Sequence, residues 1–186
     1  MVKIVLDTGV LISNIGGFRS DDIVRDNTAK AILDFLKTNS AKFALYFSER
    51  TKFELLGYFE KNGEIEIAMD ELMHYSMLPS HSINETWDEI NLTWGNLESK
   101  WGDNDEFNLG ESLATALPDK SKKRNNNDRG IVGDAIMNSC HVILHENPRD
   151  FIKLEKICSV KGILIVNLLN SEPESIIFKL KNLIID

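Results

Sequence analysis

The distribution of apolar and polar positions along the chain predicts a series of short buried strands. Residues 2–6 (VKIVL) are mostly apolar and rich in β-branched side chains, which is typical of a buried strand. Three later runs have a similar character, at residues 42–47, 142–144 and 161–166. All four runs are too short for helices that would pack by themselves, so we expect strands that come from well-separated parts of the chain.

Apolar residues spaced three or four positions apart predict helices between these strands. The best delimited helix is expected over residues 49–60, because Ser48 is a suitable N-cap and Lys61-Asn62-Gly63 is a suitable C-terminal stop. Gly57 lies inside this helix and costs about 1 kcal/mol relative to alanine, which weakens its second half. Its apolar face is expected to consist of Phe53, Leu55, Leu56 and Phe59.

Strands that alternate with helices indicate an α/β fold built around a mostly parallel sheet. The length of 186 residues fits a single domain, residues 1–186. A chain of this length buries enough surface to fold without a disulfide or a structural metal. The remaining helices are expected over residues 28–36, 64–74, 128–141, 148–158 and 172–185.

The charge balance limits the functions that the chain can have. The chain has 21 Lys and Arg against 29 Asp and Glu, a formal net charge of -8. This balance argues against a protein that coats nucleic acid by bulk electrostatic attraction. It does not exclude an enzyme that acts on nucleic acid, because a site made of several carboxylates makes its protein acidic and recruits cations.

Cysteine usage and hydropathy give expectations about the compartment. Cys140 and Cys158 provide neither a disulfide framework nor the spacing of a zinc site. The apolar run after Lys3 ends at Asp7, which is unlike a signal peptide. The densest apolar stretch, residues 162–169, is far shorter than the roughly 20 residues that span a bilayer. We therefore expect a protein of the reducing cytoplasm without membrane association.

Two segments differ from the rest of the chain. Residues 84–101 contain Trp87, Trp94 and Trp101, which are seven residues apart and would form a stripe on one helix face. We expect this stripe to pack on its own domain; a partner surface is the main alternative, and base stacking is a third. Residues 120–127 (KSKKRNNN) form the densest basic cluster, which we expect to be a mobile loop. This loop is either a solvated linker or a contact for a phosphate backbone.

Four acidic residues lie after strands or in the adjoining helices. Ligands of parallel α/β sheets lie beyond the carboxyl ends of the strands. Asp7 follows the first strand directly, Asp150 follows the strand at residues 142–144, and Glu54 and Asp134 lie in neighbouring helices. Each acid by itself has a structural explanation, such as helix capping or a solvated helix position. Their joint placement predicts a shared acidic site.

Four segments, in this order, resemble the motifs of the PIN-domain nucleases. They are KIVLDTGVLI at residues 3–12, TKFELL at 51–56, GDAIMNSCHVIL at 133–144 and ENPRDF at 146–151. The resemblance extends to about residue 166. It implies a three-layer α/β/α sandwich with a central, mostly parallel sheet. Residues 64–127 do not match, and we expect them to form a helical insertion.

The resemblance also implies an activity, the metal-dependent hydrolysis of RNA phosphodiester bonds by an endoribonuclease. The catalytic residues and metal ligands would be Asp7, Glu54, Asp134 and Asp150, whose hard oxygen atoms suit Mg²⁺ or Mn²⁺. Such an ion activates water and stabilises the leaving oxygen. Thr8 would hydrogen-bond a ligand or the scissile phosphate. The basic residues that would guide the RNA are Lys120, Lys122, Lys123, Arg124, Arg129 and Arg149.

The chain departs from the PIN pattern at several site positions. Gly9 stands where an Asn is common, and His145 stands where a Thr is common. Asn147 stands where a further Asp is common and competes with Asp150 for the fourth position. Asp128 is a further acid that could bind the metal or support its ligands.

The expected partners follow from the same resemblance. RNA is the expected substrate, and a toxin-like member of the family would have an antitoxin as protein partner; a homodimer is a further expectation. Two alternatives stay open. One is a non-catalytic PIN-like binding module in which the tryptophan stripe is an interface, and the other is a structure-specific DNA nuclease that uses the same acids.

Overall fold

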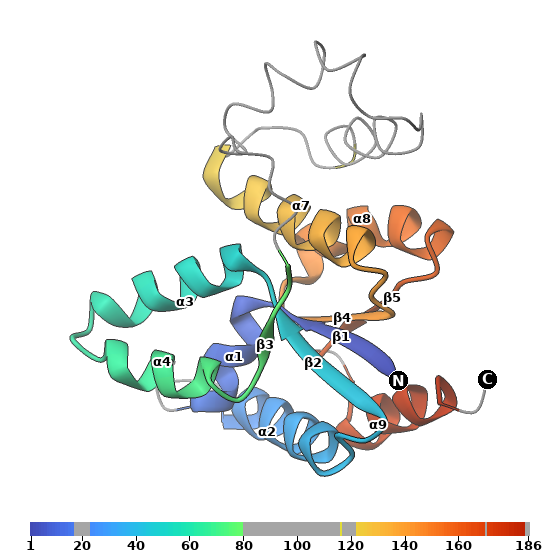
Figure 1. Ribbon diagram of the computed structural model, residues 1–186, viewed down its shortest axis with the longest axis horizontal. Coiled ribbons are helices and arrows are strands. Elements are labelled where there is room, and N and C mark those ends of the chain that lie inside the picture. The colour runs from blue at the N-terminus through green and yellow to red at the C-terminus, as the bar shows by residue number, and fades with distance from the viewer. Residues whose placement is uncertain (17–22, 80–115, 117–121, 170, 185–186) are drawn as a thin grey trace.

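A computed structural model describes residues 1–16, 23–79, 116, 122–169 and 171–184, with the backbone alone for residues 122–127. The described residues form a central five-stranded sheet, fully parallel, with helices packed on both faces (Figure 1). This is a three-layer α/β/α sandwich, so the expected fold class is confirmed. The strand order is β3-β2-β1-β4-β5. The strands are β1 (Val2–Leu6), β2 (Phe43–Phe47), β3 (Ser76–Met77), β4 (Val142–His145) and β5 (Leu164–Asn167).

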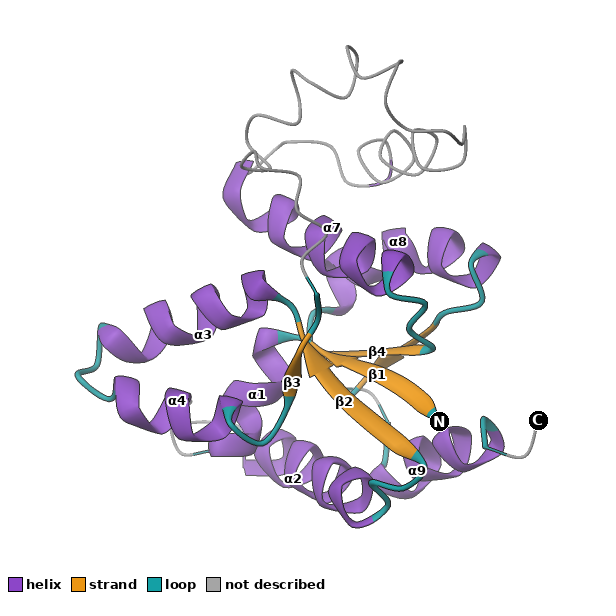
Figure 2. Ribbon diagram, viewed as in Figure 1, coloured by secondary structure: helices purple, strands orange, loops and turns teal. Residues whose placement is uncertain are grey.

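The helices divide between the two faces of the sheet. Helices α2 and α9 lie against one face and α7 and α8 against the other, whereas α3 and α4 project to one side (Figure 2). The short helix α1 follows β1 directly and packs on α2. The helices are α1 (Thr8–Ile15), α2 (Ile23–Thr38), α3 (Glu49–Glu60), α4 (Ile65–Leu72), α7 (Lys122–Met137), α8 (Pro148–Val160) and α9 (Pro173–Asn182).

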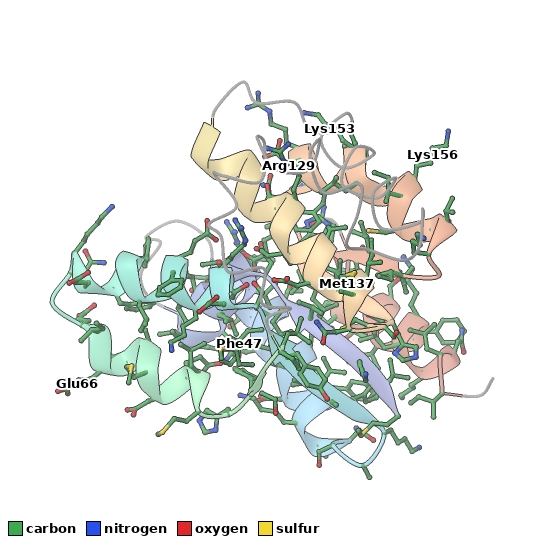
Figure 3. All side chains as sticks on the ribbon, turned by 45° about the horizontal axis from the view of Figure 1, so that its top comes forward. Phe47, Glu66, Arg129, Met137, Lys153 and Lys156 are labelled. Atoms are coloured by element: carbon green, nitrogen blue, oxygen red, sulfur yellow. The ribbon has the colours of Figure 1, made fainter. Side chains whose placement is uncertain are left out.

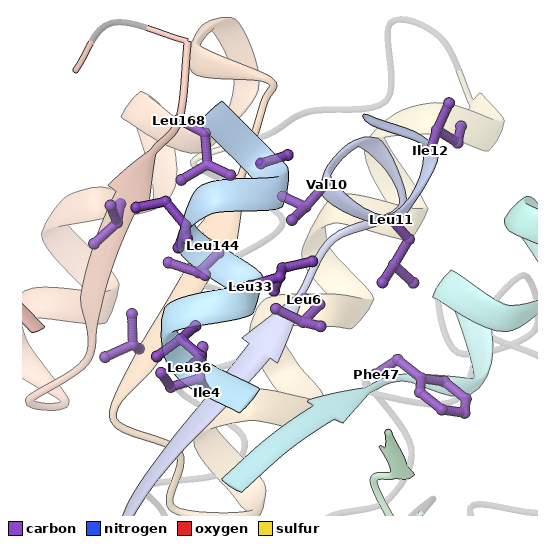
Figure 4. Close-up of a cluster of buried hydrophobic side chains, with 14 of the residues drawn as sticks. Ile4, Leu6, Val10, Leu11, Ile12, Leu33, Leu36, Phe47, Leu144 and Leu168 are labelled. Carbon is purple, nitrogen blue, oxygen red and sulfur yellow. The ribbon is translucent and has the colours of Figure 1, made fainter. Parts of the chain in front are cut away.

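Successive residues of the central strands belong to two different cores, because side chains alternate between the faces of a sheet. Leu6 and Leu144 pack with α1 and with Leu33 of α2 in the first core, part of which is shown in Figure 4. Val5 and Ile143 belong to the second core, under α7 and α8. Burial on both faces explains why these strands are almost continuously apolar in sequence.

Helix α3 has the predicted bounds, and its cap is the predicted one. Ser48 Oγ accepts a hydrogen bond from the Thr51 amide at 3.1 Å. Gly57 does not interrupt the helix. The predicted apolar face is wrong for Phe53, which is 64% exposed. The buried stripe follows a spacing of four residues, because only that side of the helix meets its neighbours; it consists of Thr51, Leu55 and Phe59.

The expected loop at residues 120–127 is wrong from Lys122 onwards, where α7 begins. Asparagine has a low intrinsic helix propensity. A helix that is already anchored by core contacts extends at little cost, however, and Ile131, Val132 and Ala135 of α7 are fully buried. The other predicted elements are present, with ends that differ by a few residues.

The expected helical insertion at residues 64–127 is only partly described. It begins with α4, as predicted, but it also contains β3, which pairs with β2 at the edge of the sheet. A strand of two residues is too short to leave a periodic signal in the sequence. Trp87, Trp94 and Trp101 lie outside the described residues.

A search of the described helices finds none with the length and apolar character needed to cross a membrane.

Candidate functional site

The sheet has a topological switch point between β1 and β4. From β1 the chain proceeds outward through β2 to β3, and it then returns to the other side of β1 to form β4 and β5. In open α/β sheets the connections on the two sides of such a point diverge, which leaves room for a ligand beyond the carboxyl ends of the two strands. The residues that follow β1 and β4 are therefore the first candidates for a site.

We call Asp7, Thr8, Glu54 and Glu146 the β1 cluster. Asp7 directly follows β1, and its amide donates to the Leu144 carbonyl of β4 at 3.0 Å, so the backbone holds it at the switch point. Thr8 begins α1, and its Oγ1 donates to Glu54 Oε2 of α3 at 2.7 Å. Two of the predicted site acids, Asp7 and Glu54, are thus brought to the same place.

Glu146 is the member of the β1 cluster that the sequence did not assign to the site. It follows β4, and its Oε2 accepts a hydrogen bond from Ser13 Oγ at 2.9 Å and forms an ion pair with Arg25 of α2. Gly9 makes this position accessible: a Cβ atom at Gly9 would lie 3.2 Å from Glu146 Cβ and 3.5 Å from Asp7 Oδ2. A side chain at residue 9 would therefore crowd Glu146, which explains why a glycine stands where the resemblance to PIN-domain nucleases predicts an Asn.

Asp7 is the electrostatic centre of the β1 cluster. Only 7% of its surface is exposed. Burial raises the pKa of its carboxyl group to about 7, and the Glu54 and Glu146 carboxylates add to this, although the amides of Thr8 and Gly9 partly oppose it. At neutral pH the Asp7 carboxylate is therefore poorly stabilised by the protein itself, and a cation or a proton there would relieve the repulsion.

We call Asp128, Asn147 and Asp150 the β4 cluster. Asn147 immediately precedes α8, and its Nδ2 donates to Asp150 Oδ2 at 3.0 Å and to Asp128 Oδ2 of α7 at 3.1 Å. Lys153 Nζ lies 3.8 Å from Asp150 Oδ1, one turn along α8. Asn147 and Asp150, the two alternatives for the fourth site position, thus lie together. The side-chain amide of Asn147 lies between the carboxylates of Asp128 and Asp150 and donates to both.

His145 shapes the turn between β4 and the β4 cluster. Its ring stacks on Phe151 with centroids 4.3 Å apart, and its Nδ1 accepts a hydrogen bond from the Asn147 amide at 3.1 Å. Burial lowers the pKa of His145 to about 4, so the ring is neutral at physiological pH. His145 therefore fixes the backbone that presents Asn147.

Asp134 lies elsewhere on α7. It is six residues beyond Asp128, which is about 9 Å along the axis and about 120° around it. The negative charge of Asp134 affects the thiol of Cys140. Cys140 and His141 are the two residues before the amino end of β4. Burial, with Asp134, raises the pKa of that thiol to about 11. Asp128 is therefore the acid of α7 that contacts the β4 cluster, and the place of Asp134 in the site stays a prediction.

The structure separates the predicted substrate-binding residues. Lys122, Lys123 and Arg124 form the first turn of α7, at the end of the helix that also carries Asp128. Arg129, marked on α7 in Figure 3, is only 9% exposed. Arg149 is exposed in the first turn of α8. Lys120 lies outside the described residues.

The donor atoms of both clusters are of one chemical type. Carboxylate and amide oxygens are hard ligands of the kind that Mg²⁺ and Mn²⁺ prefer, and the electrostatics of Asp7 favour a bound cation. Among the described residues, no three His, Cys, Asp or Glu side chains are already arranged as a complete metal-binding group. The residues fit such an ion by chemistry and charge.

Comparison with known proteins adds no assignment. A scan against models of known protein families finds no match, and no curated protein matches the sequence.

Proposed function

We propose that this chain is a metal-dependent nuclease that hydrolyses RNA phosphodiester bonds at the switch point of its sheet. The observation that carries the proposal is the buried Asp7 carboxyl group, whose pKa is raised to about 7 beside Glu54 and Glu146. Burying a carboxylate beside other carboxylates is destabilising unless a cation or a proton offsets the repulsion. Strongly perturbed groups at a site of this kind are typical of functional centres.

Mg²⁺ or Mn²⁺ would be held by Asp7 and Glu54 of the β1 cluster, with Asp128 and Asp150 of the β4 cluster at the neighbouring strand end. When bound, the ion supplies charge neutralisation at the phosphate and activation of water. Thr8 orients Glu54 through its hydrogen bond of 2.7 Å. Asn147 keeps Asp128 and Asp150 apart while no cation is present. Asp134, the predicted third acid, stays a prediction that the geometry favours less than Asp128.

RNA is the proposed substrate because the ordered motifs resemble those of PIN-domain nucleases. Lys122, Lys123 and Arg124, whose backbone forms the first turn of α7, are the basic residues proposed to attract the polyanion. The same resemblance motivates an antitoxin-like protein partner and a homodimer, each of which is an analogy of fold and not of site chemistry.

The proposal is tested by metal binding and cleavage on the same protein. Mn²⁺ should give a heat of binding in calorimetry and raise the melting temperature, and labelled single-stranded RNA should be cleaved with Mg²⁺ or Mn²⁺ but not with EDTA. The same sequence as DNA distinguishes a DNA nuclease. If millimolar Mn²⁺ produces no heat of binding and no stabilisation, the proposal is rejected in favour of a non-catalytic binding module.

A further inference from the structure

Phe53 is exposed beside the proposed site. Its side chain is 64% exposed in the second turn of α3, and it directly precedes the site acid Glu54. Consecutive residues of a helix are about 100° apart around the axis, which on a helix of ordinary diameter is an arc of roughly 10 Å. Glu54 accepts a hydrogen bond from Thr8, so it is directed towards the end of β1. Phe53 therefore lies on the exposed side of α3, in the same turn as an acid of the β1 cluster.

Gly57 leaves the Phe53 ring without a covering side chain one turn further along α3. Residues four apart share a helix face, and a leucine or methionine at the later position packs on a phenylalanine at the earlier one. Beyond the adjoining helix backbone, no heavy atom of the described residues lies within 4 Å of a Cβ atom placed at Gly57. No described neighbour therefore requires a glycine at this position, and its effect is to leave that side of the ring open.

A single exposed apolar residue has no functional meaning by itself, because such residues are common on protein surfaces. Phe178 is an example: it is 66% exposed on α9, which packs on α2. Phe53 differs from Phe178 in two respects. It adjoins an acid of the proposed site, and it has a glycine one turn further along its helix, where Phe178 has Asn182.

An open aromatic ring is suited to a nucleobase. Stacking on aromatic side chains is a principal contact of proteins that bind single-stranded nucleic acid, and it accepts any base because every base has a π-face. The ring is uncharged, so stacking adds affinity without the electrostatic attraction that a chain of net charge -8 lacks. A nucleotide that flanks a phosphate held at Glu54 can reach the ring, because Phe53 and Glu54 lie in one turn of α3.

We propose that Phe53 stacks on a base that flanks the scissile phosphate of a single-stranded RNA, and that Gly57 keeps the ring accessible to this base. This inference rests on the proposed function and adds to it a contact for a base. Phe53 is a binding residue that takes no part in the chemical step. Its contribution should therefore appear in the affinity for RNA and in KM, and not in kcat.

Substitutions at two positions of α3 separate base stacking from other roles of the ring. Phe53→Ala removes the ring, Phe53→Leu keeps an apolar side chain without a π-face, and Phe53→Trp keeps a ring. Gly57→Leu covers the native ring and also favours the helix, because leucine has a much higher helix propensity than glycine. It keeps the test decisive if Phe53→Ala folds poorly, which thermal melts establish. Phe178→Ala is the matched control, since it removes an equally exposed ring from another helix.

Binding is measured by fluorescence anisotropy with a fluorescein-labelled single-stranded RNA of 12 nucleotides, in EDTA, over a range of salt concentrations. Phe53→Ala, Phe53→Leu and Gly57→Leu should each weaken binding about tenfold or more, the effect of losing one stacked base. The slope of log K against log salt should stay that of the native chain, because no phosphate contact is lost. Phe53→Trp should bind at least as tightly as the native chain, and Phe178→Ala should be unchanged.

Fluorescence and kinetics report on the ring in two further ways. Bound RNA should quench the emission of Phe53→Trp to a greater extent than that of the native chain, whose three tryptophans lie elsewhere in the sequence. In cleavage assays with Mg²⁺, Phe53→Ala should raise KM as much as it weakens binding and leave kcat nearly unchanged. This is the pattern of a contact made equally in the bound complex and in the transition state. A loss of kcat with native KM would overturn the stacking role.

The outcomes separate this inference from the proposed function. If the native chain cleaves RNA but Phe53→Ala and Gly57→Leu match it in affinity and KM, the role of Phe53 is overturned and the nuclease stands. If Phe53→Leu binds like the native chain while Phe53→Ala does not, the contact is apolar packing and stacking is overturned. If the native chain binds RNA in a Phe53-dependent way but cleaves none, the nuclease fails and the base contact stands. If it neither binds nor cleaves RNA, both are rejected.

Discussion

The β1 and β4 clusters lie at neighbouring strand ends but differ in how they accommodate their carboxylates. In the β4 cluster an amide donor from Asn147 joins Asp128 and Asp150, so the protein itself satisfies both acids. In the β1 cluster the Arg25 ion pair and Ser13 serve Glu146, whereas Asp7 faces two carboxylates and carries a raised pKa. The protein therefore supplies a hydrogen-bond donor to both carboxylates of the β4 cluster, but it does not offset the repulsion on Asp7 in the β1 cluster.

This difference indicates which residues would respond first to an ion. An acid whose charge the protein already satisfies gains little from a cation, while a buried acid with acidic neighbours gains much. We expect Asp7 to dominate metal binding and the β4 cluster to complete it.

Asp7→Asn should abolish RNA cleavage. Loss of a residue that only supports a metal ligand already costs roughly 10–100-fold, so loss of the ligand itself should exceed that. The melting temperature of the metal-free variant should be equal to or above that of the native protein, because a repelled charge is removed. Multiple-turnover cleavage assays and thermal melts in EDTA measure the two effects, and full turnover in the variant would defeat the assignment of Asp7.

The stability of the metal-free native protein should fall as the pH rises from 4 to 7. The pKa of Asp7 is about 7 in the folded state against 3.8 as its ordinary value, so the folded state binds the proton more tightly and loses that advantage as the proton leaves. The difference corresponds to at most about 4 kcal/mol. Urea denaturation in EDTA at several pH values measures it. Asp7→Asn should show a flatter profile in that range, and parallel profiles for the two proteins would contradict the raised pKa.

Asp128→Asn should reduce cleavage about 10–100-fold, and Asp134→Asn should reduce it less than about tenfold. The two residues lie on the same helix, but Asp128 contacts Asn147 whereas Asp134 acts on Cys140. Steady-state kinetics of the pair decide between them. The reverse ranking would restore Asp134 as the acid that α7 contributes to the site and would remove Asp128 from it.

Asn147→Ala should destabilise the metal-free protein by about 2 kcal/mol, because two carboxylates lose their shared donor. Asp7→Asn should have the opposite sign in the same denaturation experiment. Mn²⁺ should raise the stability of Asn147→Ala by more than it raises that of Asp7→Asn, which lacks the acid expected to dominate metal binding. Equal signs for the two variants would show that the clusters do not differ in the way described.

Lys153→Met should change stability by no more than about 0.5 kcal/mol. Its amine is 3.8 Å from Asp150, but its side chain is 46% exposed, and ion pairs in solvent contribute little. Denaturation at low and high salt provides the check. A large loss would mean that Asp150 depends on this lysine rather than on Asn147.

Much of the fold was predictable because it depends on local patterns. The strands are short apolar runs, and α3 has both a capping serine and a terminating glycine, so the sequence contains its boundaries. The wrong predictions arise where tertiary contacts override local preference. The start of α7 is helical although it is rich in asparagine, and Phe53 is exposed because no neighbour covers that side of α3.

The site was predictable to a lesser extent, for a geometric reason. Asp7, Glu54 and Asp150 follow strands or lie near helix starts, and sequence order alone indicates this. The choice between Asp128 and Asp134 depends on the rotation of α7, which a weakly amphipathic sequence does not fix. Glu146 could have been noticed from its place after β4, but its approach to Asp7 depends on Gly9, which lies 137 residues earlier in the chain.

The strand order has a consequence for the time at which the acids meet. β1 pairs with β2 within the first 47 residues but finds its other neighbour only in residues 142–145. Closing so long a loop is an entropically costly step that comes late in folding. A chain still being synthesised would therefore carry Asp7 without Glu146, Asn147 or Asp150, so the proposed metal site would stay incomplete until these residues had been made.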